Sequence, residues 1–306
     1  MGFVLPQFGI FAQGTHAHHF LEFDLRPDVR PADAVESFRR LRTPDVSAGG
    51  VNLVVAFGAE AWREVAPADA PDSLEPFPGI ETNEGPTVPA TQHDAWMWIS
   101  GAGPDTTFDH ARAATRAVAD VAELVAEQPG FTYHEGRDET GFVDGTANPP
   151  LLRAADVALV GSGLPGEGGS HVLAMRWVHD LDAFERLPIG EQEAVFGRTK
   201  PDSEELADGV KPPTAHIARV EIEAGGEELE IFRRSVPYGS IGEHGLYFLA
   251  FSSEPTRYLS MLARMFGTSG DGVRDRLTSF SRPVSAALYF APSLNALRRL
   301  AGPEED

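Results

Sequence analysis

The sequence predicts an α+β fold of two ferredoxin-like modules, each built in βαββαβ order around an antiparallel sheet. The 306 residues are enough for about two domains. In the first half, hydrophobic periodicity indicates the order strand, helix, strand, strand, helix, strand. The second half repeats a similar order. We therefore place the modules at residues 1–150 and 151–306.

The elements of the first module follow from the spacing of its apolar residues. Apolar and acidic residues alternate over 21–25, which predicts a half-buried strand. Apolar residues three and four apart from 108 to 125 predict the clearest helix, with a capping box of Thr106 and Asp109 at its start and Pro129-Gly130 as its stop. The other predicted elements are a helix that opens at Pro31 and strands over 51–57, 95–99 and 131–134.

The second module is predicted from the same signals. Two segments of the chain break the regular pattern. Residues 67–91 in the first module, rich in proline and acid, predict a long surface insertion, and residues 161–170 near the start of the second predict a flexible connector. Strands are expected over 171–178, 216–222, 229–236, 246–251 and 284–290, and helical pieces over 183–187, 190–196 and 255–266, the last ended by Gly267.

Charge and cysteine content exclude several classes of function. A formal net charge of −21 and a pI of about 4.8 argue against nucleic acid, because such a chain repels phosphate backbones. The acidity either attracts cations, such as a metal ion or a positively charged substrate, or only keeps the protein in solution. The absence of cysteine excludes disulfides, thiolate ligands, cysteine nucleophiles and covalent haem attachment through C-x-x-C-H. A transition metal would need histidine and carboxylate ligands.

No segment indicates export or a membrane span. The first residues, MGFVLPQFGIFAQG, lack the basic start and the long apolar run of a secretory signal. No stretch approaches the roughly 20 apolar residues that cross a bilayer. We therefore expect a cytoplasmic protein without a membrane partner.

Asp144 is the first candidate for chemistry. It lies in GFVDGTANP between Gly141 and Gly145, which allow a sharp turn that presents one carboxylate. Thr146 and Asn148 are expected to add short-range hydrogen bonds. The alternative is an Asx-turn in which Asp144 caps its own loop, and the loop alone does not decide between the two.

His216 and the pair Arg233 and Arg234 are further candidates. His216 follows two prolines and opens the predicted strand 216–222, where it is either a ligand or a satisfied core histidine. Arg233 and Arg234 precede VPYGS, and neighbouring residues on a strand point to opposite faces. The pair lies either at a solvated strand end or with one guanidinium inside the protein, where it needs an anion.

Three histidines near the N-terminus form another cluster. His16 and His18 would share one face of an extended segment, with His19 beside them. A metal site is one interpretation, although no patterned carboxylate lies nearby.

Three motifs together resemble those of the dye-decolourising peroxidases, and in particular their shorter, bacterial B-type branch. They are GFVDGT at 141–146, His216 within HIARVE, and RRSVPYGS at 233–240. The ordered set of an aspartate loop, a later histidine and a later arginine makes the resemblance specific. It extends over most of the chain, through the segments 6–25, 191–206, 245–251 and 290–293.

The resemblance implies a cofactor and a role for each motif residue. The cofactor is haem b, an iron protoporphyrin IX, held without a covalent bond mainly by the C-terminal module. His216 is then the axial ligand of the iron, Asp144 the distal acid, and Arg233 the distal arginine beside the haem. Asp275, in VRDRL, is the candidate carboxylate that hydrogen-bonds the axial histidine.

Ser235 departs from the B-type pattern, which usually has asparagine two residues after the distal arginine. Serine is shorter and offers one hydroxyl in place of an amide. We therefore expect Ser235 to reach peroxide only through water, and to change peroxide activation or its pH optimum.

The implied function is a haem-dependent peroxidase that reduces hydrogen peroxide and oxidises dyes, phenolic compounds or Mn(II) in one-electron steps. The alternative is a haem-binding or haem-handling protein with little peroxidase turnover. A third possibility is a metal-dependent hydrolase that uses Asp144 and the N-terminal histidines. The resemblance also implies a homo-oligomer. Because the chain ends at PEED soon after its last helix, we expect no packaging in an encapsulin shell.

Overall fold

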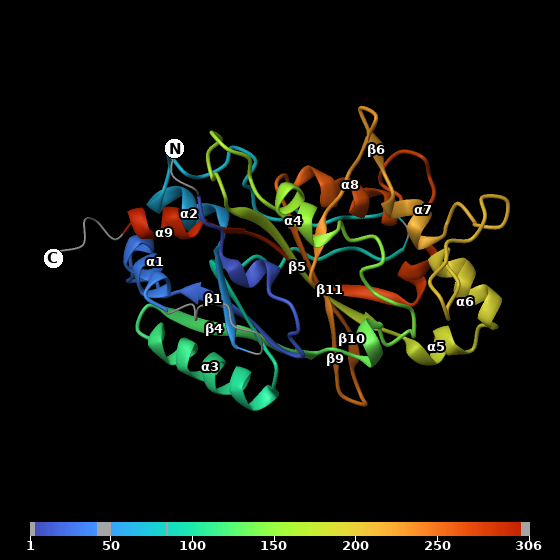
Figure 1. Cartoon of the computed structure of the whole chain (residues 1–306), viewed down its shortest axis with the longest axis horizontal. Helices are drawn as coiled ribbons and strands as arrows, with labels where there is room; N and C mark the ends of the chain where they lie inside the picture. The colour runs from blue at the N-terminus through green and yellow to red at the C-terminus, as the bar shows by residue number, and fades with distance from the viewer. Residues whose placement is uncertain (1–3, 42–49, 84, 301–306) are drawn as a thin grey trace.

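The computed structural model describes residues 4–41, 50–83 and 85–300. Figure 1 shows a central sheet, with α1, α2, α3 and α9 gathered at one end of the molecule and α5, α6 and α7 at the other. The helices are α1 (Pro31–Arg39), α2 (Ala59–Val65), α3 (Pro104–Ala117), α4 (Leu151–Ala158), α5 (Leu181–Glu185), α6 (Ile189–Phe196), α7 (His216–Val220), α8 (Thr256–Met265) and α9 (Leu294–Arg299), with 3₁₀ turns at Phe8–Phe11, His134–Gly136 and Arg276–Ser279.

The strand order confirms two ferredoxin-like modules. In each half the sheet order is fourth, first, third, second, and every pairing is antiparallel. The two halves join edge to edge between β2 and β11, where Phe57 pairs with Phe290. The first half contains β1 (Ala17–Leu25), β2 (Asn52–Phe57), β3 (Ala95–Gly101) and β4 (Ala122–Phe131); the second contains β5 (Ser170–His179), β8 (Phe232–Arg233), β9 (Val236–Gly239), β10 (His244–Ser252) and β11 (Ser281–Ala291), and β6 (Glu223–Ala224) pairs with β7 (Glu227–Glu228) apart from the sheet.

Alternation along the strands sorts the apolar side chains into layers. Between the two halves of the sheet, Phe20 of β1 stacks on Tyr247 of β10 with ring centroids 3.7 Å apart. On the outer face of the first half, strand residues such as Phe23 pack against α1, α2 and α3. On the outer face of the second half, Met175 of β5 packs in one cluster with Leu262 of α8. This last layer positions the functional site.

The predicted helix over 106–125 is wrong in its extent. Helix α3 starts at Pro104, whose fixed φ suits the first turn, and ends at Ala117. The Thr106 hydroxyl donates to the Gly103 carbonyl, so it forms no capping box. Residues 122–131 instead form the edge strand β4, where the missing N–H of Pro129 is tolerated.

The predicted strand over 216–222 is also wrong. Residues His216–Val220 form the short helix α7. Ile217 and Val220 lie three apart, which is helical spacing, and both border one cavity. The histidine is therefore presented by a helix.

The segment 67–91 is more than a surface insertion. Leu74, Phe77 and Val88 within it are buried. Thr91 is tied to Ala286 of β11 by a backbone hydrogen bond of 3.0 Å, and its hydroxyl accepts from the Ala286 N–H at 3.0 Å. The segment thus covers part of the second module.

Candidate functional site

A large cavity lies in the second module, against the outer face of β5 and β10 and beside α7 and α8. It encloses about 1450 Å³ of empty space, part of which is open to solvent. Small-molecule sites are mostly apolar. Asp144, His216 and Arg233 all border this cavity, so three candidates from distant parts of the sequence come together. Leucine, methionine, phenylalanine and tryptophan side chains supply much of the remaining wall.

His216 is oriented by a buried carboxylate. Its Nδ1 lies 2.7 Å from Oδ2 of Asp275, and the two side chains are 24% and 0% exposed. The other oxygen, Oδ1, accepts from the Leu277 N–H at 2.8 Å. Because the Asp275 N–H also donates to the Met265 carbonyl, the carboxylate is fixed to the end of α8. Only Nε2 of His216 is left for a ligand in the cavity.

Asp144 is held by a loop that needs glycine on both sides. Gly141 and Gly145 have φ angles of 87° and 79°, where a side chain would be strained. The Asp144 N–H donates to the Gly136 carbonyl at 3.0 Å. The residue is half-buried, and it borders the cavity. Burial raises the pKa of Asp144 above its ordinary value of 3.8, and the positive charge of Arg233 opposes this rise.

Asn148 joins this loop to Arg233. Its amide donates to the Arg233 carbonyl at 2.9 Å and accepts from the Arg233 N–H at 2.8 Å. The sequence suggested only short-range bonds for Asn148, whereas these partners are 85 residues away. The pair of bonds fixes the backbone of β8 against the Asp144 loop, and no local signal could have revealed it.

The two neighbouring arginines diverge, as expected on a strand. Arg233 borders the large cavity, whereas the Arg234 guanidinium lies over the Trp98 ring, 5.3 Å from its centroid. Ser235 borders a second cavity on the Arg234 side, and its hydroxyl accepts from the Leu249 N–H at 3.2 Å. Its effect on peroxide activation stays a prediction.

The N-terminal histidines do not gather into a cluster. His18 is buried and its Nδ1 accepts from the Trp98 indole, while His19 lies 3.2 Å from Glu127. Across the described ranges, no group of three or more histidine, aspartate or glutamate side chains is placed to hold a metal ion. The same part of the chain contains no helix with the length and apolarity to cross a bilayer.

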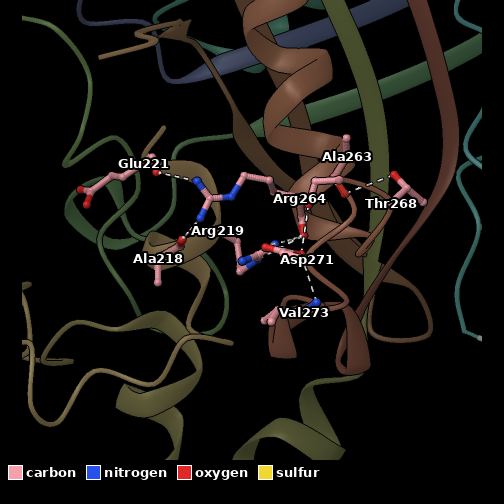
Figure 2. A network of polar contacts seen from close by, with 9 residues as sticks. Ala218, Arg219, Glu221, Ala263, Arg264, Thr268, Asp271 and Val273 are labelled. Carbon is pink, nitrogen blue, oxygen red and sulfur yellow. Dashed lines mark hydrogen bonds and ion pairs between the residues drawn. The ribbon is translucent and has the colours of Figure 1, made fainter. Parts of the chain in front are cut away.

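Two arginines clamp α7 to α8, as Figure 2 shows. Arg219 is 3% exposed and donates twice to the Arg264 carbonyl, at 3.1 and 3.0 Å, and once to Asp271 at 2.7 Å. In return, Arg264 donates to the carbonyls of Ala218 and Glu221. Sequence spacing does not reveal a buried guanidinium that joins two helices, so the sequence did not predict the roles of these two arginines.

Comparisons with known proteins agree on one family. The chain matches the family model "Dyp-type peroxidase, N-terminal" over residues 31–132 and "Dyp-type peroxidase, C-terminal" over residues 135–296. It is 36% identical to the dye-decolorizing peroxidase of Rhodococcus erythropolis over 256 residues, which cover 82% of this chain and 75% of that protein. It is also 36% identical to the dye-decolorizing peroxidase of Mycobacterium tuberculosis over 251 residues, 81% of this chain and 75% of that one.

Solved structures agree as well. A putative Dyp-type peroxidase from Shewanella oneidensis superimposes with a TM-score of 0.91 at 33% identity, over 97% of this chain and 99% of that one. A variant of Rhodococcus jostii RHA1 DypB in complex with heme gives a TM-score of 0.87 at 33% identity, with coverage of 96% and 98%. Another DypB variant, in complex with manganese, gives 0.84 at 33% identity, with coverage of 92% and 94%.

Proposed function

The chain belongs to the Dyp-type peroxidase family, and from this premise we propose that it is a haem peroxidase whose His216 holds the iron and whose Asp144 and Arg233 act on hydrogen peroxide. The observation that carries the proposal is the meeting of these three side chains in one cavity. If these side chains lay in separate places, they could not act on one peroxide molecule bound at the iron.

The residues present fit non-covalent haem b. The cavity wall is mostly apolar, as a porphyrin requires. An imidazole whose other nitrogen faces a carboxylate is a common iron ligand, and the carboxylate makes it a stronger electron donor. Tyr258 borders the same cavity with a buried hydroxyl that has no partner in the described chain. A cofactor with polar edges would supply one.

The chain's own residues divide the work on peroxide. When bound, haem iron supplies the redox chemistry that cleaves the O–O bond and accepts electrons one at a time. The ionised Asp144 carboxylate takes a proton from one peroxide oxygen and returns it to the other, directly or through one water. The Arg233 guanidinium donates hydrogen bonds to the oxygen that gains negative charge, and it helps to keep Asp144 ionised. Asp275 holds His216 in one orientation.

The reaction with peroxide should depend on pH through Asp144. Burial raises the pKa of this carboxyl above 3.8. As the pH falls, the carboxylate is therefore protonated, and can no longer accept a proton from peroxide, at a higher pH than an exposed aspartate would be. The rate should be full above the raised pKa and fall as pH drops through it. Asp144→Asn should lower the rate by about 10²–10⁴-fold. It should also remove the fall in rate at low pH, which we call the acid limb. Stopped-flow absorbance after mixing with peroxide measures both.

Asp138 offers the matched control. It also borders the cavity, but its carboxylate is engaged by His179 at 3.2 Å and by the Thr140 hydroxyl at 2.7 Å. Asp138→Asn should keep an acid limb. An Asp144→Asn protein with the wild-type rate and the wild-type limb would rule out the proton-transfer role, whereas a wild-type protein that barely reacts with peroxide would favour a haem-handling protein with little turnover.

The hydrogen bonds of Arg219 and Arg264 between α7 and α8 should fix the position of His216, and with it the strength of its bond to the haem iron. Arg219→Met removes three hydrogen bonds and leaves Asp271 without this partner. We expect haem retention to fall by about tenfold, and the melting temperature to fall by several degrees, about 2–4 °C per kcal/mol lost. The charge-transfer bands of the bound haem should also shift. Arg219→Lys should restore part of each effect, and Arg299→Met, which removes a surface pair with Asp69, should leave the spectrum unchanged.

The proposed function also implies reaction partners, an assembly state and a location. We propose dyes, phenolic compounds or Mn(II) as reductants, and the manganese complex of a DypB variant supports the last. We also propose a homo-oligomer, which family resemblance supports, and a cytoplasmic location. We also keep the module boundary near residue 150, where two prolines precede α4.

A further inference from the structure

A second cavity adjoins the first on the side of Arg234. It shares Asp144, Gly145 and Arg233 with the large cavity, and it encloses about 1170 Å³ of empty space, part of which is open to solvent. Its other walls come from segments 13–18, 132–137, 148–151 and 232–237, so it lies where the two modules meet. Arg234 and His18, which also line it, have no part in the proposed peroxide chemistry.

Arg234 is a guanidinium without a carboxylate. It lies over the Trp98 ring, and its Nη2 donates a long bond of 3.3 Å to the Thr15 hydroxyl. Its Nη1 is buried and has no hydrogen-bond partner. No ion pair within the described ranges includes this residue. Burial lowers the pKa of Arg234 to about 10, so the side chain remains charged at neutral pH. Such a charge is costly to bury unless something compensates it.

His18 adds a second donor to the same wall. It is 2% exposed, and its ring lies nearly parallel to that of Trp98, with centroids 5.9 Å apart and an interplanar angle of 9°. Its Nδ1 accepts from the Trp98 indole at 3.1 Å, so the proton of the neutral ring belongs on Nε2. Burial, with the nearby charge of Arg234, lowers the pKa of His18 to about 3, and the ring is neutral. Nε2 is buried and has no hydrogen-bond partner.

The charges on the wall have one dominant sign. Arg137, Arg233 and Arg234 all border the cavity, and Asp144 is the one carboxylate among its described lining residues. The Arg137 guanidinium donates to backbone carbonyls of Gly141, Lys200 and Pro201, which do not neutralise it. A positive cavity in a chain of net charge −21 is a local exception. Its most natural occupant is an anion.

We propose that this second cavity binds a small carboxylate anion at the wall formed by Arg234 and His18. Both unpartnered groups can only donate, so their ligand must accept hydrogen bonds. A carboxylate matches the forked donors of a guanidinium and has lone pairs left for the imidazole N–H. The inference does not rest on the haem assignment, because neither Arg234 nor His18 borders the large cavity.

Acetate and bromide test the site in the haem-loaded protein. Isothermal titration calorimetry with sodium acetate should give one site with a dissociation constant on the order of 1 mM. Arg234→Met should weaken binding at least about tenfold, and His18→Phe, which keeps a ring on Trp98, should weaken it less. In crystals soaked with bromide, an anomalous peak should lie within hydrogen-bond distance of Arg234 and His18.

Arg176→Met is the matched control. Arg176 also lies over an aromatic ring, that of Tyr238, but it has its own carboxylate, Glu243, and it does not border the cavity. It should bind acetate as the wild type does. Equal acetate affinity in the Arg234→Met protein, or bromide bound at Arg233 instead, would overturn the proposal. The proposal would also be overturned if bromide bound only at the high concentration of the crystal soak and no anion bound in solution. Loss of haem from Arg234→Met would also overturn it, because a haem propionate would then be the anion.

Discussion

Replacing His216 with alanine should abolish haem retention. The rest of the cavity wall is largely apolar, and the iron would lose the imidazole that Asp275 holds in place. We expect haem affinity to fall at least about a hundredfold, beyond the 10–100-fold typical of losing a partner of a metal ligand. The measurement is the Soret absorbance per polypeptide after purification from haem-supplemented cells, followed by titration of the protein with hemin.

Two variants calibrate this result. Asp275→Asn keeps the ligand but weakens its orientation, so haem should be retained with about 10–100-fold lower affinity. His19→Ala removes another mostly buried histidine, which faces Glu127 instead of the cavity, and it should retain haem normally. A His216→Ala protein that carries as much haem as the wild type would refute the assignment of His216 as the axial ligand. It would also remove the basis for the roles of Asp144 and Arg233.

The fold was predictable wherever one periodicity dominated a segment. Both modules were expected in βαββαβ order, and the strand order in each half agrees. The errors lie where short apolar runs fit two periods. The run HIARV is short enough for a strand or one turn of helix, and the hydrogen bonds between α7 and α8 add to the helical spacing of Ile217 and Val220 in favour of α7. Residues 122–125, the start of β4, were assigned to a helix because pairing with β1 cannot be seen in the sequence.

The site was predictable from motifs but not from geometry. Asp144, His216 and Arg233 were proposed from their motifs, and the structure brings them to one cavity. The contacts that hold them there join residues far apart in the chain. Asn148 reaches Arg233 across 85 residues and Arg219 reaches Arg264 across 45, and each bond is to a backbone carbonyl that leaves no trace in the sequence.

Replacing Arg233 with leucine should affect peroxide activation in two ways. The loss of a fixed positive charge beside the departing oxygen should slow the reaction with peroxide by about 10²–10³. Burial raises the pKa of Asp144 while Arg233 lowers it, so removing the arginine should move the acid limb to higher pH. Stopped-flow traces across pH give both quantities, and haem should be retained because His216 is intact.

Arg233→Lys separates charge from hydrogen-bond geometry. A lysine restores the positive charge without the planar fork of donors. The acid limb should therefore return toward its wild-type position, while the rate above that limb recovers only in part. If Arg233→Leu slows the reaction without moving the limb, Arg233 does not act on Asp144 and serves only the departing oxygen. If the rate also stays within about threefold of the wild type, far short of what a lost charge contact costs, then the guanidinium takes no part in cleaving peroxide.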